Sequence, residues 1–326
     1  MAGLIFADSF DHHNGYQIDA RKGWGTATGR DSGRGVAGYS ITSGDLLFPE
    51  TAIIAVGMAF RTVAWGNNSI KICDGLGRRL VSIDLWSDGR LGVSSGMGGF
   101  GQGPSGYVGH LNQWAYHELR AFIYLISPDP PRYAIDFHAY VNEKSELSGT
   151  LSSLVVPSPF FRQLTLVGAG GGVLHRRDDI YITDGEVLGD VRIEPLHPGS
   201  DGYYAGWTPN GGSAHYDRVD EALVDDETTY LEAAAIGAAE SHALAAHDTG
   251  ETKGIYVWLG LRNTLGEASK TTSLLRISGA DYLGDEKAPA STYKFYGEGR
   301  LTNPATGLAW TDGDLDALEL GVVNSA

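Results

Sequence analysis

The sequence has almost none of the residues that build disulfides or cysteine-rich metal sites. Among 326 residues, Cys73 is the single cysteine, so an intrachain disulfide and a multi-cysteine zinc site are both excluded. We expect Cys73 to be a small buried hydrophobic residue. The chain also has no apolar run near the ~18 residues that a membrane-spanning helix requires. It begins MAGLIFADSFDHH, without the basic start and long apolar stretch of a signal peptide.

Basic residues are scarce compared with acidic ones. The chain has 24 Lys and Arg residues against 40 Asp and Glu residues, a formal net charge of −16. Nucleic-acid backbones and anionic lipid surfaces carry charge of the same sign, so non-specific attraction to either is disfavoured. The composition therefore predicts neither a nucleic-acid partner nor a membrane partner.

Sustained helical periodicity is also scarce, whereas glycine is abundant at 46 residues. Short segments instead alternate apolar and polar residues between Gly, Asp and Asn punctuation, which is typical of strands. A tight hairpin is expected at the Asp88-Gly89 pair. The expected strands of the first half are 4–10, 51–63, 69–74, 79–86, 91–95, 114–126, 132–147, 162–168 and 178–184. Strands with this spacing predict an all-β chain built as a two-sheet sandwich or jelly roll.

The segment RYAIDFHAYV shows the alternation most clearly. Tyr133, Ile135, Phe137, Ala139 and Val141 share one face of the expected strand, and the residues between them share the other. We expect one side to be buried and the other to meet water or a partner. The sequence VNEKS that follows predicts a hairpin turn.

The amino-acid composition changes near Asp190, which predicts two domains, residues 1–190 and 191–326. Residues 197–226 are rich in Gly, Pro, Asp and Asn, which is typical of loops joining short strands. Apolar runs resume at 253–263, 272–279, 291–298 and 316–323, so a second β-sandwich is expected. The alanine-rich segment 230–248 departs from this pattern, because its intrinsic propensity favours helix.

No paired carboxylates stand out for hydrolytic chemistry. Glycosidases use two carboxyl groups on either side of the bond, but the chain has no Glu-x-Asp-x-Glu segment on an expected strand. Asp84 is the only acid on its strand, Asp136 has His138 but no acid beside it, and Glu143 and Glu146 lie at an expected turn. The simplest interpretation of these acids is a solvated strand face.

Two glycine motifs have the spacing of known sites but not the surroundings. GVSSG at 92–96 matches the nucleophile-elbow spacing, and GMGGFG at 96–101 matches a dinucleotide-binding spacing. Both motifs require a strand that runs into a helix, whereas this stretch continues as QGPSGYVG. A loop at the rim of the sandwich is the better interpretation, and binding residues often lie on such loops.

The histidines do not form a metal-binding pattern. His12 and His13 are adjacent and would point to opposite faces of a strand, and His242 and His247 are five residues apart, a poor fit to a helical pair. We therefore predict no cofactor. Calcium stays open, because carboxylates and backbone oxygens from several loops can hold it without a linear motif.

One long segment resembles a known family. RRDDIYITDGEVLGDVRIEPL at 176–196 is similar to the closing strand of laminin-G-like, concanavalin A-like jelly rolls in bacteriophage and prophage virion proteins. The matching residues are Asp178, Asp179, Ile180, Tyr181, Asp184, Gly185, Leu188, Gly189, Asp190, Val191 and Arg192. GLIFADSFDHH resembles the first strand of the same domains, and segments 201–237 and 302–322 resemble the module that commonly follows. The resemblance thus reaches both ends of the chain.

The resemblance implies a specific structure and function. Asp178 and Asp179 would begin a strand, with Ile180 and Ile182 on one side and Tyr181 on the other, while Arg176 and Arg177 neutralise the acids or cap a sheet edge. In the alanine-rich segment, 229–231 and 240–244 would be short strands separated by a turn at Gly237. The chain would be a non-enzymatic virion protein of a tailed phage, at the tail, tail tip or surface fibre or decoration. It would assemble in the bacterial cytoplasm as a homo-oligomer with other virion proteins.

Lectin-like domains at such positions can contact host glycans, because aromatic faces pack against the apolar sides of sugars. The candidate contacts are Trp65, Trp86, Phe100 and Tyr107. Two alternatives stay open: a tail-associated polysaccharide-degrading enzyme, and a cellular carbohydrate-binding or adhesion module. The sequence leaves the choice between head and tail, and the copy number, undecided.

Overall fold

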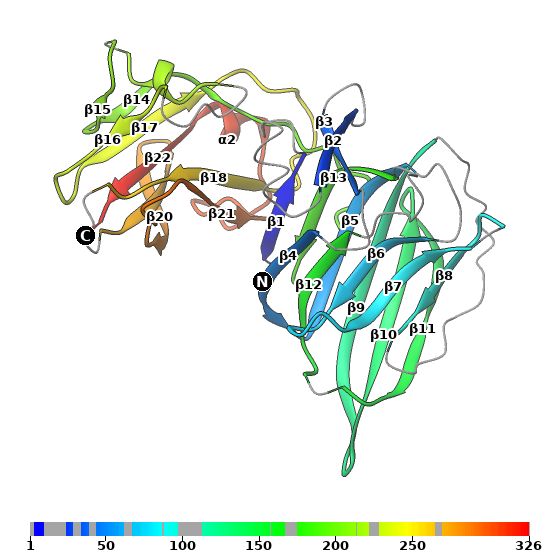
Figure 1. Cartoon of the computed structure of the whole chain (residues 1–326). Helices are drawn as coiled ribbons and strands as arrows, with labels where there is room; N and C mark the ends of the chain where they lie inside the picture. The colour runs from blue at the N-terminus through cyan, green and yellow to red at the C-terminus, as the bar shows by residue number, and fades with distance from the viewer. Residues whose placement is uncertain are drawn as a thin grey trace. The chain divides into compact units, whose positions relative to one another are not determined.

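The chain divides into two compact units, residues 1–193 (unit 1) and 194–326 (unit 2). The division follows Ile193, three residues after the expected boundary. The computed structural model (Figure 1) describes residues 3–9, 24–28, 34–38, 44–61, 67–86, 88–96, 113–156, 158–166, 175–212, 214–221, 228–264 and 269–325. Each unit is built from antiparallel strands, which confirms the prediction of an all-β chain.

Unit 1 is a sandwich of two antiparallel sheets, and Figure 1 shows the smaller sheet in front of the larger one. Within the described residues, the larger sheet has the order β11 (Lys144–Leu154), β10 (Pro131–Val141), β9 (Trp114–Pro128), β5 (Ile53–Arg61), β13 (His175–Thr183), β3 (Arg34–Gly38) and β2 (Trp24–Thr28), with β1 (Leu4–Asp8) paired to β13. The smaller sheet has the order β4 (Gly44–Thr51), β12 (Phe161–Leu166), β6 (Asn67–Cys73), β7 (Arg79–Leu85) and β8 (Leu91–Ser94).

The core of unit 1 consists of the alternating apolar residues that the sequence displays. Ile135, Phe137, Ala139 and Val141 of β10 are all buried, and His138 between them is exposed. The predicted turn after β10 is confirmed, because Asn142 and Glu143 both have positive φ, at 47° and 67°, as a two-residue hairpin turn of this type requires. The tight hairpin at Gly89 (φ 83°) is confirmed as well.

Unit 1 also buries two basic side chains beside one phenylalanine. The Arg177 guanidinium lies 5.2 Å from the Phe60 ring centroid, and the His117 ring lies 5.4 Å from it. Burial lowers the pKa of Arg177 to about 9 and that of His117 to about 4, because a charged group loses its hydration there. The expectation that Arg177 caps a sheet edge was wrong, since β13 is flanked by β5 and β3.

Unit 2 is a smaller sandwich. Its main sheet has the order β14 (Pro198–Ala205), β17 (Ala239–Leu244), β22 (Leu318–Asn324), β19 (Thr271–Ile277) and β20 (Ala280–Lys287), and a second sheet pairs β18 (Ile255–Leu261) with β21 (Lys294–Arg300). The core between the two sheets consists of Val257, Leu275, Ile277, Trp310, Leu315 and Leu318. Smaller elements are the pair β15 (Thr208–Pro209) and β16 (Leu231–Glu232), the 3-10 turn η2 (Tyr216–Arg218) and the short helix α2 (Asp312–Asp316).

The alanine-rich segment forms two short strands and a turn at Gly237, in the order that the family resemblance implied, but the first strand lies at Leu231–Glu232 and not at 229–231. β16 ends at Glu232, β17 begins at Ala239, and Gly237 between them has φ 83°. Helix propensity is a weak local preference that tertiary packing overrides. Here β17 pairs with β14 on one side and β22 on the other.

Candidate functional site

The smaller sheet of unit 1 carries a polar face opposite its apolar one. The strand register places Ser82 beside Lys71 and Ser94, and Asp84 beside Gly92. On β12, Gln163 and Thr165 lie opposite Cys73 and Lys71, and the Gln163 Nε2 donates to the Thr165 Oγ1 at 3.2 Å. This face is named the polar face below.

Asp84 is the best-organised acid on the polar face. The Ser82 hydroxyl donates to Asp84 Oδ1 at 2.8 Å, and the Ser94 hydroxyl donates to Asp84 Oδ2. Asp84 is part-buried, and both its oxygens accept hydrogen bonds, one from Ser82 on its own strand β7 and one from Ser94 on β8. The signal was present in the sequence: Ser82 and Asp84 are two residues apart on β7, and the hairpin brings Ser94 opposite them. Ser94 is also the serine of the GVSSG motif, and here it orients a carboxylate.

Trp86 lies at the edge of this face and is 44% exposed. Its indole packs directly on the backbone of Gly92, since a Cβ at Gly92 would come 2.2 Å from Trp86 Nε1. In the turn between β7 and β8, Asp88 and Arg90 form an ion pair at 2.5 Å. The hydrogen bond from the Arg90 side chain lowers the pKa of Asp88. The exposed indole of Trp86 therefore lies beside the hydrogen-bonded cluster of Asp84, Ser82 and Ser94.

Among the four candidate contacts predicted from sequence, the structure places Trp86. Trp65, Phe100 and Tyr107 lie outside the described residues, as does most of the GMGGFG motif, so their contacts stay predictions. Cys73 is fully buried, as expected, and its Sγ lies 3.6 Å from Thr165 Oγ1.

The DDIYITDGEVLGDVR segment forms a clamp on the outer face of the larger sheet. Tyr181 donates its hydroxyl proton to Glu118, and the amides of Leu188 and Gly189 donate to Tyr181 and Glu118, each at 2.9 Å. Asp179, with φ 46°, lies at a break in the β13 register and accepts from the Ile193 amide at 3.0 Å. The acids thus serve to fasten residues 188–193 to the sheet.

Burial sets the protonation of this clamp. It raises the pKa of the Glu118 carboxyl, against the opposing effect of its hydrogen bonds, and it raises the pKa of the Tyr181 hydroxyl. Buried groups favour their uncharged forms because hydration is lost. Sequence reasoning missed Glu118, since an isolated acid within a strand is usually exposed.

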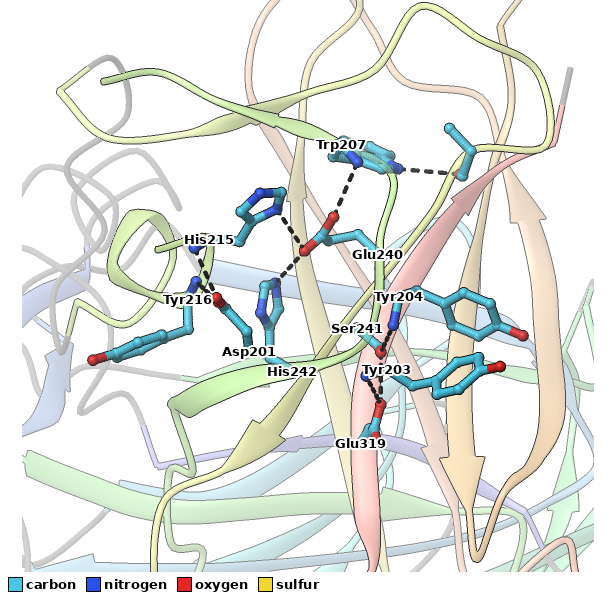
Figure 2. A network of polar contacts seen from close by, with 11 residues as sticks. Asp201, Tyr203, Tyr204, Trp207, His215, Tyr216, Glu240, Ser241, His242 and Glu319 are labelled. Atoms are coloured by element: carbon cyan, nitrogen blue, oxygen red, sulfur yellow. Dashed lines mark hydrogen bonds and ion pairs between the residues drawn. The ribbon is translucent and has the colours of Figure 1, made fainter. Parts of the chain in front are cut away.

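A second polar network lies in unit 2 (Figure 2). Glu240, which is 1% exposed, accepts from the Trp207 amide at 3.0 Å, and its Oε1 lies 3.0 Å from His215 Nδ1 and 3.9 Å from His242 Nε2. Asp201 Oδ1 accepts from the amides of His215 and the next residue, Tyr216, at 2.9 and 2.8 Å. These bonds tie the 207–216 connection to the sheet.

Burial dominates the titration of this network as well. It raises the pKa of Glu240, although the Trp207 amide and His215 oppose the shift, and it lowers the pKa of His242. Both shifts favour uncharged side chains. Within the described part of the chain, no three His, Cys, Asp or Glu side chains are grouped so as to hold a metal ion. No helix among the described residues has the length and hydropathy needed to cross a membrane.

No model of a known protein family matches the chain, and no curated protein matches its sequence. Among solved structures, the chain is similar to a sialidase, with TM-score 0.37 and 10% identity over 56% of this chain and 18% of the sialidase chain. It is similar to domain 4 of a GH43 extracellular arabinanase from Geobacillus stearothermophilus in complex with arabinotriose, with TM-score 0.37 and 13% identity over 56% and 93% of the two chains. It is also similar to the receptor-binding domain of botulinum neurotoxin type G, with TM-score 0.34 and 11% identity over 91% and 81%. Similarity at this level assigns neither a family nor a function.

Proposed function

We propose that this chain is a non-enzymatic structural protein of a tailed-bacteriophage virion that contacts host-surface glycans through the polar face of unit 1. The glycan part rests on one observation: the indole of Trp86 is 44% exposed and sits on Gly92 beside the Asp84 cluster. The virion part rests on the resemblance of segments 176–196, 201–237 and 302–322 to phage virion proteins.

The chemistry of the polar face suits a sugar. A pyranose has an apolar C–H side that packs on an aromatic ring, and hydroxyls that hydrogen-bond at its rim. Trp86 supplies the ring and the half-buried Asp84 supplies acceptor lone pairs beside it. Ser82 and Ser94 already hold the carboxylate in place. Binding therefore does not have to bear the entropy cost of ordering this side chain.

The same arrangement argues for binding without cleavage. A glycoside hydrolase places two carboxyl groups about 5 to 9 Å apart across the bond that breaks. Both oxygens of Asp84 are occupied by serine hydroxyls, and Glu118 and Glu240 are buried in clamps that fasten the chain to its sheets. On the particle the chain would be repeated, in contact with its own copies and with other virion proteins after assembly in the bacterial cytoplasm.

A host-glycan array with full-length protein tests the binding. We expect a defined set of bound glycans, lost in Trp86→Ala and kept in Leu76→Ala, which trims a more exposed side chain on the β6–β7 turn. An array without binding removes the glycan part. Immunogold labelling of purified particles tests the virion part separately, and particles without label would contradict it.

A further inference from the structure

We propose that Tyr203, Tyr204, Arg276 and Asp281 form a second sugar-binding platform, on unit 2, which takes an uncharged pyranose. These four residues are called the tyrosine platform below. The inference goes beyond the proposed function, because it uses no residue of unit 1.

The backbone beneath the platform is rigidly held. The Tyr203 amide donates to Glu319 Oε2 at 2.8 Å and the Tyr204 amide donates to Ser241 Oγ at 3.0 Å. Ser241 in turn donates its hydroxyl proton to the same Glu319 oxygen at 2.6 Å. Figure 2 shows these bonds holding β14 against β17 and β22, with the two tyrosine rings projecting side by side.

A glycine permits this close approach. A Cβ on Gly202 would lie 2.6 Å from the Glu319 Oε2, the Ser241 carbonyl oxygen and the Ser241 hydroxyl. Any side chain there would push the strand off the sheet. The positions of both rings therefore follow from Gly202, Ser241 and Glu319 together.

The rings themselves are also fixed. They meet edge to face, with centroids 4.9 Å apart and planes at 88°. The Arg276 guanidinium lies 4.0 Å from the Tyr203 ring centroid and donates to Asp281 at 2.6 Å. The Tyr204 hydroxyl donates to the other Asp281 oxygen at 2.6 Å, so one carboxylate orders both the cation and the second ring.

Tyr203 nevertheless remains 67% exposed. Arg276 lies over one face of the ring and Tyr204 packs against it at 88°, so the exposed fraction is the part of the ring that these two contacts leave open. A ligand that covers the exposed part of this ring removes apolar surface from water, which favours binding. Ordering an exposed aromatic beforehand favours binding, since the side-chain entropy is lost in folding and not on association.

The neighbouring groups select the ligand. A flat aromatic face with a carboxylate and a phenol at its edge matches the C–H side and the hydroxyls of a pyranose. The Arg276 cation is paired with the Asp281 carboxylate at 2.6 Å, so the platform offers no uncompensated positive charge to an anionic sugar, and the net charge of −16 on the chain disfavours one further. An uncharged pyranose is therefore the ligand class that fits.

Saturation-transfer NMR on the full chain tests this directly. The probes are methyl glycosides of glucose, galactose, mannose and N-acetylglucosamine, with N-acetylneuraminic acid as the anionic probe. A Trp86→Ala background removes the proposed unit 1 contact, so that signal from an uncharged glycoside reports the platform. In that background, Tyr203→Ala should weaken binding about tenfold or more, the effect of losing one aromatic contact, and Ile236→Ala, which trims another exposed residue of unit 2, should not.

The outcomes separate the two proposals. Binding that survives Tyr203→Ala in the Trp86→Ala background overturns the platform, as does the loss of all binding in Trp86→Ala alone, which leaves the unit 1 proposal standing. No signal from any glycoside in the wild type overturns the platform too. A shift in sedimentation on Tyr203→Ala without sugar binding would assign the face to a protein partner instead. Tyr203→Leu, which keeps apolar volume over Arg276, repeats the test if the alanine variant fails to fold.

Discussion

At the scale of single residues, the fold depends on polar groups that are buried but paired. Tyr181 reaches Glu118 across Gly57, whose missing side chain leaves room for the ring. A buried polar group that loses its hydrogen-bond partner destabilises the fold. Substitutions at neighbouring positions that keep such a pair together are therefore expected to lower stability. Gly57 and Gly92 are both of this kind, the first under Tyr181 and the second under Trp86.

Gly57→Ala is expected to destabilise unit 1. The new Cβ would lie 2.2 Å from the Tyr181 ring, which must move away from Glu118, and overpacking of this kind costs roughly 1–3 kcal/mol. Chemical denaturation measures the change in the free energy of unfolding. Gly250→Ala is the matched control, because a Cβ there meets nothing within 4 Å; equal stability of the two variants would contradict the prediction.

Stability is expected to fall on mild acidification because of His117. Its pKa is lowered to about 4 by burial, against about 6.5 in the unfolded chain. A depressed histidine pKa means that the unfolded state binds the proton more readily, so stability is complete above pH 6.5 and is lost as pH falls towards 4. The loss from this residue at pH 5 is about 2 kcal/mol.

Denaturant unfolding at pH 7.5 and pH 5 checks this sign. His117→Leu should flatten the dependence on pH, although His242, whose pKa is also lowered, keeps part of it. His138→Leu, which removes an exposed histidine of β10, is the control variant. The raised pKa values of Glu118 and Glu240 act in the opposite direction in both proteins, so the comparison decides: a His117→Leu variant with the same pH dependence as the wild type would show that His117 is not held uncharged.

At the scale of elements, the sequence predicted the strands where burial alternates. The buried face of β10 is an example, because the alternate spacing of Ile135, Phe137 and Ala139 is enough to predict it. The bulge at Asp179 could not be predicted in this way, since a positive φ at a non-glycine residue is imposed by partners elsewhere in the chain. Buried Arg177 was likewise missed, because an arginine in a sequence is normally assigned to the surface.

The candidate site was predictable in part. Trp86 was proposed from its aromatic chemistry, and its exposure agrees with that proposal without testing it. The Ser82-x-Asp84 spacing with the 88–89 hairpin held the information that Ser94 lies opposite Ser82. The tyrosine platform could not be seen, because Tyr203, Arg276 and Asp281 come from three strands whose order is set by the sheet topology. Arg276 and Asp281 face each other across the β19–β20 hairpin, but the sequence spacing of Tyr203 from this hairpin carries no signal of contact.

Helix α2 offers a local test at this scale. Thr311 and Asp314 form a reciprocal capping box, in which the Asp314 amide donates to Thr311 Oγ1 at 3.2 Å and the Thr311 amide donates to Asp314 at 2.9 Å. Thr311→Ala should lower the free energy of unfolding by about 1 kcal/mol, whereas Thr311→Ser should be close to neutral. Thermal or chemical unfolding distinguishes them, and two equally destabilised variants would mean that the cap is not the cause.

At the scale of the whole molecule, the chain is two β-sandwich units, and polar side chains fasten their connections to the sheets. The buried acids Glu118 and Glu240 fasten connections to sheets, while the exposed aromatics Trp86 and Tyr203 are seated on ordered supports. If Trp86 and Tyr203 both bind sugar as proposed, repetition of the chain on a particle makes the attachment multivalent.

Far-UV circular dichroism should show a β-dominated protein. Within the described residues the helical elements are short, α2 and η2, and the alanine-rich segment forms strands. The average globular protein has about a third of its residues in helices. A helix content above about a tenth would contradict the assignment of residues 230–248 to strands and a turn.

The measurement that tests the central claim most directly is incubation of the full-length protein with host exopolysaccharide, followed by co-sedimentation and a reducing-end assay on the same sample. The account predicts that the protein sediments with the polysaccharide in a Trp86-dependent manner and that reducing ends do not increase. A rise in reducing ends that disappears in Asp84→Asn would contradict it, because the polar face would then break bonds and not only bind.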